Sequence, residues 1–296
     1  MLMIAAPVLW STAGVVTRHV EKAAAFEQVF WRSAFAFAFV FAVLLFSRRN
    51  PFLEVKKFGK PGILSSFLWA LMFTTFVVAL SLTSTANTLV VMSISPLLTA
   101  FLAWAVLKES VPGRTWLAAG AAGVGIAWMA ASGVEAHGAR DIAGMLVALT
   151  VPVAAATNFV NLRAMALRDE SVRVDLVPAV MLGGLISCLV ALPLGLPLQA
   201  SGRDLALLAF LGVFQLGLPC MLMVVASRTL AAPEVALLGL LEVLLGTLWA
   251  WLFAGEEPAA ATLAGGTMVL GALIFNELAG IWGTISAKLS VTRTSG

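Results

Sequence analysis

Apolar residues fill this chain in long runs that short polar or basic segments interrupt. Each run has about the 20 residues that an α-helix needs to cross roughly 30 Å of hydrocarbon at about 1.5 Å per residue. The pattern predicts an all-α polytopic membrane protein with ten transmembrane helices. Their predicted limits are 2–18, 28–46, 61–82, 85–107, 115–132, 142–163, 176–196, 204–227, 233–254 and 260–284.

Composition supports the membrane assignment. Hydrophobic residues make up 61% of the chain and charged residues 11%, whereas about 25% of a soluble domain is charged. The net charge is +3, but the basic residues lie in short connections between apolar runs, so the expected partner is a lipid bilayer and not a nucleic acid. Cys188 and Cys220 fall inside apolar runs and are interpreted as small buried hydrophobes. Neither a metal nor another cofactor is expected.

The distribution of Lys and Arg among the connections predicts the orientation. Of the 18 basic residues, thirteen fall in one set of alternating connections and the C-terminal tail, and Arg32 lies within a run. The opposite set has only Arg18, Lys22, Arg140 and Arg203. Because cytoplasmic loops are enriched in Lys and Arg, both termini are expected in the cytoplasm, in a bacterial inner membrane. No basic leading region precedes the first run, which argues against a cleaved signal peptide.

The two halves of the chain are weakly similar to each other. SPLLTAFLAWAVLKE (95–109) aligns with EVLLGTLWAWLFAGE (242–256) at an offset of 147, with identities that include Trp104/Trp251 and Glu109/Glu256. The predicted units are a five-helix repeat at 1–133, a second at 141–285 and a cytoplasmic tail at 286–296. Since five is odd, the second repeat crosses the membrane in the opposite direction. Inverted repeats of this kind are typical of secondary transporters that work by alternating access.

The Leu241-Glu242 to Glu256 pattern of the ninth segment, and its counterpart from Ser95-Pro96 to Glu109, resemble the EamA branch of the drug/metabolite transporter superfamily. The opening VLWST (8–12), followed by Arg18, further resembles YddG-type exporters of aromatic and other amino acids. The resemblance implies ten helices and export of small metabolites. Family members commonly have Glu-Pro in the ninth segment, where this chain has Val243 after Glu242, so a proline kink is not implied there.

Polar and aromatic side chains at similar depth on different segments indicate a central cavity. Glu242 is the most informative, because a carboxylate at the bilayer centre costs about 2.5–3.5 kcal/mol or more. It is expected to bind a substrate ammonium group or carry a proton; the alternative is a protonated or hydrogen-bonded Glu242 that joins helices through Asn158 or Gln215. The full set of candidate cavity residues is Trp10, Ser11, Thr12, Phe73, Phe76, Met92, Ser95, Pro96, Thr157, Asn158, Asn161, Gln215 and Glu242.

Arg32 lies four residues into the predicted second segment, with Glu27 about one turn before it. Its long stem allows the guanidinium group to reach the membrane interface, and this interpretation is favoured over a clamp for a substrate carboxylate.

These features favour a secondary transporter that exports small amphipathic metabolites, with hydrophobic or aromatic amino acids preferred by resemblance. A multidrug or organic-cation exporter is the main alternative, since Glu242 suits a cation equally well; a channel or lipid scramblase is less favoured. No GxxxxGK[ST] loop for ATP occurs. No convergent catalytic set lies at membrane depth, so an enzyme is not expected. A monomeric form is compatible with this organisation.

Overall fold

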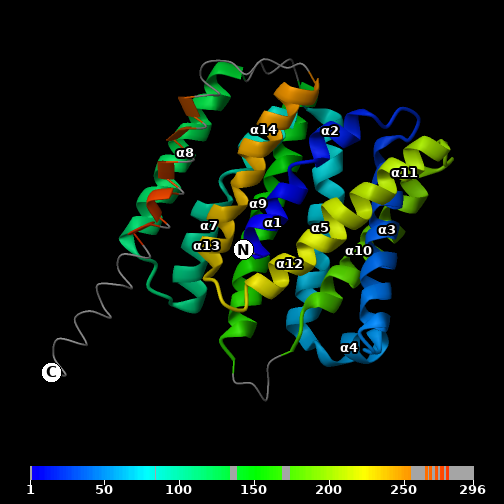
Figure 1. Ribbon diagram of the computed structural model, residues 1–296, viewed down its shortest axis with the longest axis horizontal. Helices are drawn as coiled ribbons and strands as arrows, with labels where there is room; N and C mark the ends of the chain where they lie inside the picture. The colour runs from blue at the N-terminus through cyan, green and yellow to red at the C-terminus, as the bar shows by residue number, and fades with distance from the viewer. Residues whose placement is uncertain are drawn as a thin grey trace.

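The computed structural model describes residues 2–83, 85–133, 139–168 and 174–254, together with separate positions between 264 and 279. Within these residues the protein is all-helical (Figure 1). Most of the tenth predicted segment (260–284), and the whole predicted tail (286–296), lie outside the described residues.

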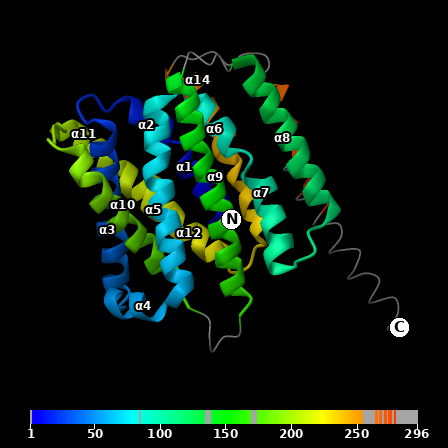
Figure 2. The same cartoon turned by 180° about the vertical axis from the view of Figure 1, so that it is seen from behind.

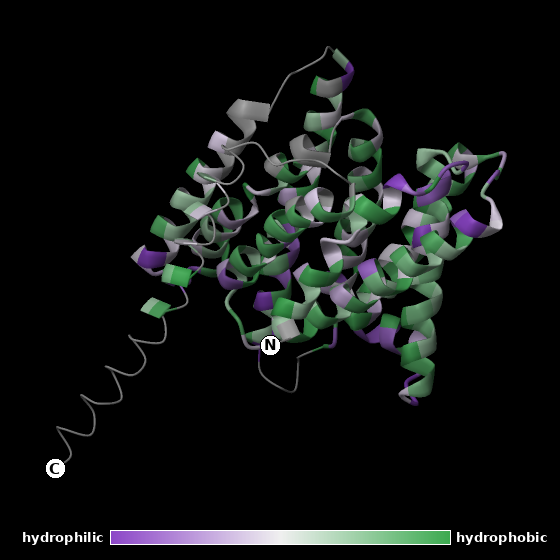
Figure 3. Ribbon diagram, turned by 45° about the horizontal axis from the view of Figure 1, so that its top comes forward, coloured by the Kyte–Doolittle hydropathy of each residue, from purple (hydrophilic) through white to green (hydrophobic). Residues whose placement is uncertain are grey.

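Within the described residues, six helices or continuous helical stretches are long and apolar enough to cross a membrane. Three of them are single helices that begin within three residues of their predicted segments: α3, α5 and α10. Their bounds are Ala25–Phe46 for α3, Gly59–Leu82 for α5 and Val177–Gly195 for α10. Helix α9 (Ala139–Ala166) contains the fourth, the stretch Gly202–Ala226 is the fifth, and Ala232–Phe253 is the sixth. Figure 3 shows apolar residues along the helices and strongly hydrophilic residues mainly near their ends and in the loops.

The remaining helices lie in the other predicted segments, except for one in the connection between the second and third segments. Their bounds are Leu2–Trp10 for α1, Ala13–Arg18 for α2, Pro51–Lys57 for α4, Thr85–Met92 for α6, Ser95–Leu102 for α7 and Gly113–Gly133 for α8. A π-helical turn, η1 (Ala103–Leu107), continues α7. The Gly202–Ala226 stretch consists of α11 (Gly202–Phe210), the π-helical η2 (Leu211–Gly217) and α12 (Leu218–Ala226).

Three of the predicted segments are interrupted in the middle. The first breaks between α1 and α2, the fourth between α6 and α7 at Ser93–Ile94, and the ninth at Leu240 between α13 (Ala232–Gly239) and α14 (Leu241–Ala254). Pro96 explains the fourth, because proline lacks the N–H that would bond the carbonyl of Met92 four residues earlier. The ninth segment is also broken, although no proline follows Glu242. Helix α13 ends at Gly239, and glycine is a weak helix former.

Helices from the two halves of the chain pack directly on one another. α3 lies along α10, and α5 lies between α9 and α10; Figure 2 shows α5 beside α9. Glycine permits the close approach: a Cβ atom on Gly184 would be 3.2 Å from the Ser33 carbonyl oxygen. Ser187 on α10 joins this interface with hydroxyl contacts of 3.0 Å to Ser33 and 2.9 Å to Thr74.

Carboxylates connect the loops of the two halves at one end of the bundle. Glu27, 1% exposed, accepts backbone N–H bonds from Gln199 (2.8 and 2.9 Å) and Ala200 (2.8 Å). Asp204 accepts bonds of 3.1 Å from the backbone N–H groups of Glu21 and Lys22. Each half therefore supplies a carboxylate to the backbone of the other half.

Ion pairs make the corresponding connection at the end that carries α4. Asp175 receives Arg49 at 2.6 Å and Arg228 at 2.7 Å. Arg163 of α9 pairs with Glu109 at 3.0 Å, just after η1. The Arg49–Asp175 and Arg163–Glu109 pairs both join residues 1–133 to residues 141–285.

Candidate functional site

A pocket lies where the three interrupted segments meet the long helices α5 and α9. Residues beside two of the breaks line it, with Met92 and Ser95 on either side of one and Gly239 and Glu242 on either side of the other. Trp10, the last residue of α1, lines it beside the third break. Broken helices are tolerated at membrane depth only where the freed backbone groups are satisfied by protein or face a cavity, so their convergence marks this pocket as the candidate site.

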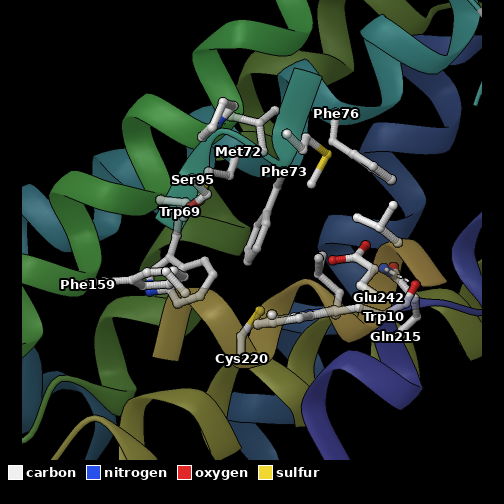
Figure 4. Close-up of a pocket in the computed structure, with 18 of the residues that line it drawn as sticks. Trp10, Trp69, Met72, Phe73, Phe76, Ser95, Phe159, Gln215, Cys220 and Glu242 are labelled. Atoms are coloured by element: carbon white, nitrogen blue, oxygen red, sulfur yellow. Dashed lines mark hydrogen bonds between the residues drawn. The ribbon is translucent and has the colours of Figure 1, made fainter. Parts of the chain in front are cut away.

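One wall of the pocket is aromatic and comes mainly from α5. Trp69, Met72, Phe73 and Phe76 are spaced i, i+3, i+4 and i+7, so they share one face of that helix. The Trp69 and Phe73 rings are 5.5 Å apart between centroids. Phe159 of α9 continues this wall, and Figure 4 shows it close to Trp69. The wall suits an apolar or aromatic part of a small molecule.

The opposite part of the pocket is polar. Figure 4 shows Glu242 beside Gln215 and Trp10, with its carboxylate directed into the pocket. Gln215 lies in the π-helical η2. Pro219, near the start of the following helix α12, has no N–H to bond the Gln215 carbonyl four residues earlier. Its side-chain N–H₂ donates a long bond of 3.5 Å to the Trp10 carbonyl. Among the described residues, Glu242 has no hydrogen bond or ion pair, to Asn158, to Gln215 or to any other group.

Arg32 also lines this pocket, so the expectation that it reaches the membrane interface is wrong. Helix α3 begins at Ala25, three residues earlier than expected. Arg32 therefore lies about 10 Å from the start of α3 along the helix axis. The residue is 2% exposed. Its guanidinium group donates to the Phe73 carbonyl at 3.1 Å and to the Gln215 side-chain oxygen at 3.4 Å, and it lies 5.6 Å from the Phe76 ring centroid.

The pocket brings together seven of the thirteen candidate residues. These are Trp10, Phe73, Phe76, Met92, Ser95, Gln215 and Glu242. The other six lie outside its lining, and most of them form hydrogen bonds elsewhere.

Ser11 and Thr12 satisfy the backbone at the first helix break and do not line the pocket. Their hydroxyl groups donate to the carbonyls of Val8 and Leu9, each at 2.7 Å. Ser11 additionally accepts a 2.8 Å bond from the Trp249 indole of α14. Pro96 is buried at the start of α7, where it breaks the helix without facing the pocket.

The polar residues of α9 face away from the pocket. Asn158 accepts a 2.7 Å bond from Ser65, and Asn161 donates a 3.0 Å bond to the Pro61 carbonyl, so both join α9 to α5. Thr157 donates to the Val153 carbonyl of its own helix at 2.8 Å. These three residues lie at the depth expected for a central cavity. Their side chains, however, bond to α5 or to the backbone of α9 and do not line the pocket.

Thirteen lining residues were not among the candidates, and they include the charged, aromatic and thiol side chains of Arg32, Trp69, Phe159 and Cys220. Trp69 shares the i, i+3, i+4, i+7 face with Phe73 and Phe76, and Phe159 follows Pro152 and Ala155 at i+7 and i+4; this periodicity could have identified both. Cys220 is a free, buried thiol whose side chain contacts Trp10. Nothing in the local sequence distinguishes it from an ordinary buried cysteine.

Comparison with known proteins defines the class. The model of the EamA-like transporter family matches residues 1–131 and 142–277. The chain therefore belongs to the EamA-like transporter family. It is a multi-pass membrane transporter, with a lipid bilayer around it and a small molecule as substrate.

A solved structure described as "Crystal structure of protein" shares the fold. Its TM-score is 0.78 at 16% sequence identity, over 94% of this chain and 95% of that one. A search of curated proteins found no significant match.

Proposed function

We propose that this transporter exports small amphipathic metabolites, most readily hydrophobic or aromatic amino acids, from bacterial cells. The pocket serves as a midplane site between two inverted five-helix repeats, 1–133 and 141–285, in a ten-span chain with both termini in the cytoplasm. Transport is by alternating access, in which the two halves open the pocket first to one side of the inner membrane and then to the other.

Two observations support the pair of repeats. The family model matches the chain twice, and the boundary between its matches falls between residues 131 and 142. The breaks at Ser93 and Leu240 are separated by 147 residues, which is the offset of the sequence similarity. Ser95 and Glu242 are equivalent under this offset, and both line the pocket.

Contacts at both ends of the bundle support the alternating mechanism. The Glu27 and Asp204 contacts connect the two halves at one end, and the Arg49–Asp175 and Arg163–Glu109 pairs connect them at the other. The two ion pairs are partly exposed, and surface-accessible ion pairs contribute roughly 0–1 kcal/mol each, so these pairs can break and re-form during a transport cycle.

The shape and polarity of the pocket carry the substrate assignment. An aromatic wall faces a polar end that contains Glu242 and Gln215. A hydrophobic amino acid has the same division, since its side chain is apolar and its ammonium and carboxylate groups are close together. A sugar or phosphate would leave most of its polar groups against the aromatic wall.

Counterflow tests this proposal. Purified protein is reconstituted into proteoliposomes that contain unlabelled phenylalanine, tryptophan or methionine, and uptake of labelled phenylalanine is measured against empty vesicles. We expect accelerated uptake with each internal amino acid, because exchange returns the loaded site across the membrane. If no amino acid accelerates uptake in folded protein, the amino-acid assignment is wrong.

An organic-cation exporter is the second candidate, and it is favoured by the Glu242 carboxyl group, which lines the pocket and has no ion-pair partner among the described residues. In that case labelled hydrophobic cations show counterflow and amino acids do not, and the Glu242→Gln variant loses cation transport. If the protein is an amino-acid carrier, the wild type shows counterflow with amino acids and not with hydrophobic cations.

A further inference from the structure

Arg32 places a cationic group in the pocket wall, where no described residue is its anionic partner. The side chain is 2% exposed, and among the described residues no carboxylate lies within 4.0 Å of it. Its two hydrogen bonds go to neutral oxygens, on Phe73 and Gln215. A guanidinium group has five N–H donors, and its Nε has no hydrogen-bond partner.

A buried charge in this condition is costly. Burial removes the hydration of the guanidinium group, and the cost is offset only when the charge is paired and its donors are bonded. Two further buried donors without partners, Trp69 Nε1 and Ser95 Oγ, belong to the lining of the same pocket. The wall therefore offers hydrogen-bond donors and one positive charge, which suit an acceptor-rich anion.

Glu242 does not meet this need. It lines the same pocket, but among the described residues it forms no ion pair with Arg32. One pocket thus contains a guanidinium group and a carboxyl group that are not joined to each other. A ligand that carries both charges can lie between them, whereas a simple cation would leave Arg32 unpaired.

We propose that Arg32 binds the α-carboxylate of a zwitterionic amino acid whose α-ammonium group binds Glu242. The inference rests on the proposed function and specifies its substrate: an amino acid with both charged groups free. The side chain of the substrate then lies along the wall formed by Trp69, Phe73 and Phe159. Gln215 positions Arg32 by accepting a hydrogen bond from its guanidinium group.

Ligands that lack one charge test this assignment. Three probes are compared: phenylalanine, phenylalaninamide (no carboxylate) and 3-phenylpropanoate (no ammonium). Binding is measured as the rise in the thermal unfolding midpoint of purified protein over a range of ligand concentrations, because a ligand that binds only the folded state stabilises it. This readout does not require transport, so variants that bind but do not transport remain informative.

In the wild type we expect phenylalanine to bind at least about tenfold more tightly than either analogue, because each analogue lacks one charged group and its hydrogen bonds. The Arg32→Gln variant should lose most of its affinity for phenylalanine and prefer phenylalaninamide. The Glu242→Gln variant should prefer 3-phenylpropanoate. Arg203→Gln, which removes an exposed arginine from its pair with Glu21, is the matched control and should behave as the wild type.

A purely structural Arg32 predicts a different result. Its loss would weaken all three probes by the same factor, and an unchanged order of affinities in Arg32→Gln overturns the proposal. If that variant does not fold, Arg32→Lys retains the charge and should keep the preference for phenylalanine at reduced affinity. Wild-type protein that binds phenylalaninamide as tightly as phenylalanine also overturns it, whereas wild-type protein that binds no probe refutes the proposed function itself.

Discussion

The π-helical η2 packs closely on α3 beside the candidate site, and this packing depends on Gly212. A Cβ atom at Gly212 would lie 2.5 Å from the Phe35 Cβ and 2.6 Å from the carbonyl oxygen of Arg32. Carbon atoms pack at about 3.5–4.0 Å, so Gly212→Ala must push these elements apart by roughly 1 Å. Because one contact is the backbone of Arg32, the change moves that side chain as well.

We expect Gly212→Ala to destabilise the protein. Overpacking costs about 1–3 kcal/mol, and the better helix propensity of alanine returns about 1 kcal/mol at most. A net loss of about 1–2 kcal/mol lowers the unfolding midpoint by roughly 2–8 °C in a protein of this size class. The assay is thermal unfolding of purified protein in detergent, with phenylalanine binding measured on the same samples.

Gly202→Ala is the control for this prediction. It lies in the same stretch, in the first turn of α11, and is exposed, and a Cβ atom there meets nothing within 4 Å. Its midpoint should match the wild type within about 1 °C. An unfolding midpoint for Gly212→Ala equal to that of Gly202→Ala would refute the claim that close packing of η2 on α3 fixes the site.

Two further changes test the contacts between helices and between loops. Ser187→Ala removes the hydroxyl group that contacts Ser33 and Thr74, and should lower stability by about 0.6–1.5 kcal/mol with unchanged ligand binding; an unaltered midpoint in thermal unfolding contradicts it. Asp175 lies outside the membrane-spanning helices. Partial burial opposes the ionisation of its carboxyl group, but the Val177 N–H, Arg49 and Arg228 together lower the pKa of Asp175 below 3.8. The ion pairs should therefore stabilise the wild type relative to Asp175→Asn above about pH 4, and this advantage should disappear as the pH falls through the lowered pKa. Unfolding midpoints measured from pH 3 to 7 test this, and a constant difference between the two proteins would disprove it.

The sequence predicts the positions of the long helices well because bilayer thickness limits them. α3, α5 and α10 begin and end within three residues of the predicted segments. Hydropathy has no comparable signal for where a helix is interrupted. Pro96 marks the break in the fourth segment, but the break at Leu240 has no proline, and a continuous apolar run hides it.

The candidate site is only partly predictable for a related reason. Depth along a helix can be counted from the sequence, and depth alone selected Phe73, Gln215 and Glu242. Whether a side chain faces the cavity or a neighbouring helix depends on how the helices pack, which the sequence does not show directly. Asn158 has the right depth but faces α5, whereas Arg32 was placed too near the membrane surface because the start of α3 was predicted three residues too late.

The central claim is that the pocket opens alternately to the two sides of the membrane and holds the substrate. Gly239 lines the pocket, and a Cβ atom there would have no neighbour within 4 Å, so Gly239→Cys is expected to place a thiol in the pocket without a clash. The variant is made with Cys188 and Cys220 replaced by alanine and is treated with a membrane-impermeant thiol reagent on either side of oriented vesicles. We expect modification from both sides, and slower modification from both when phenylalanine is present. Modification from one side only, at a rate that phenylalanine does not change, would contradict it.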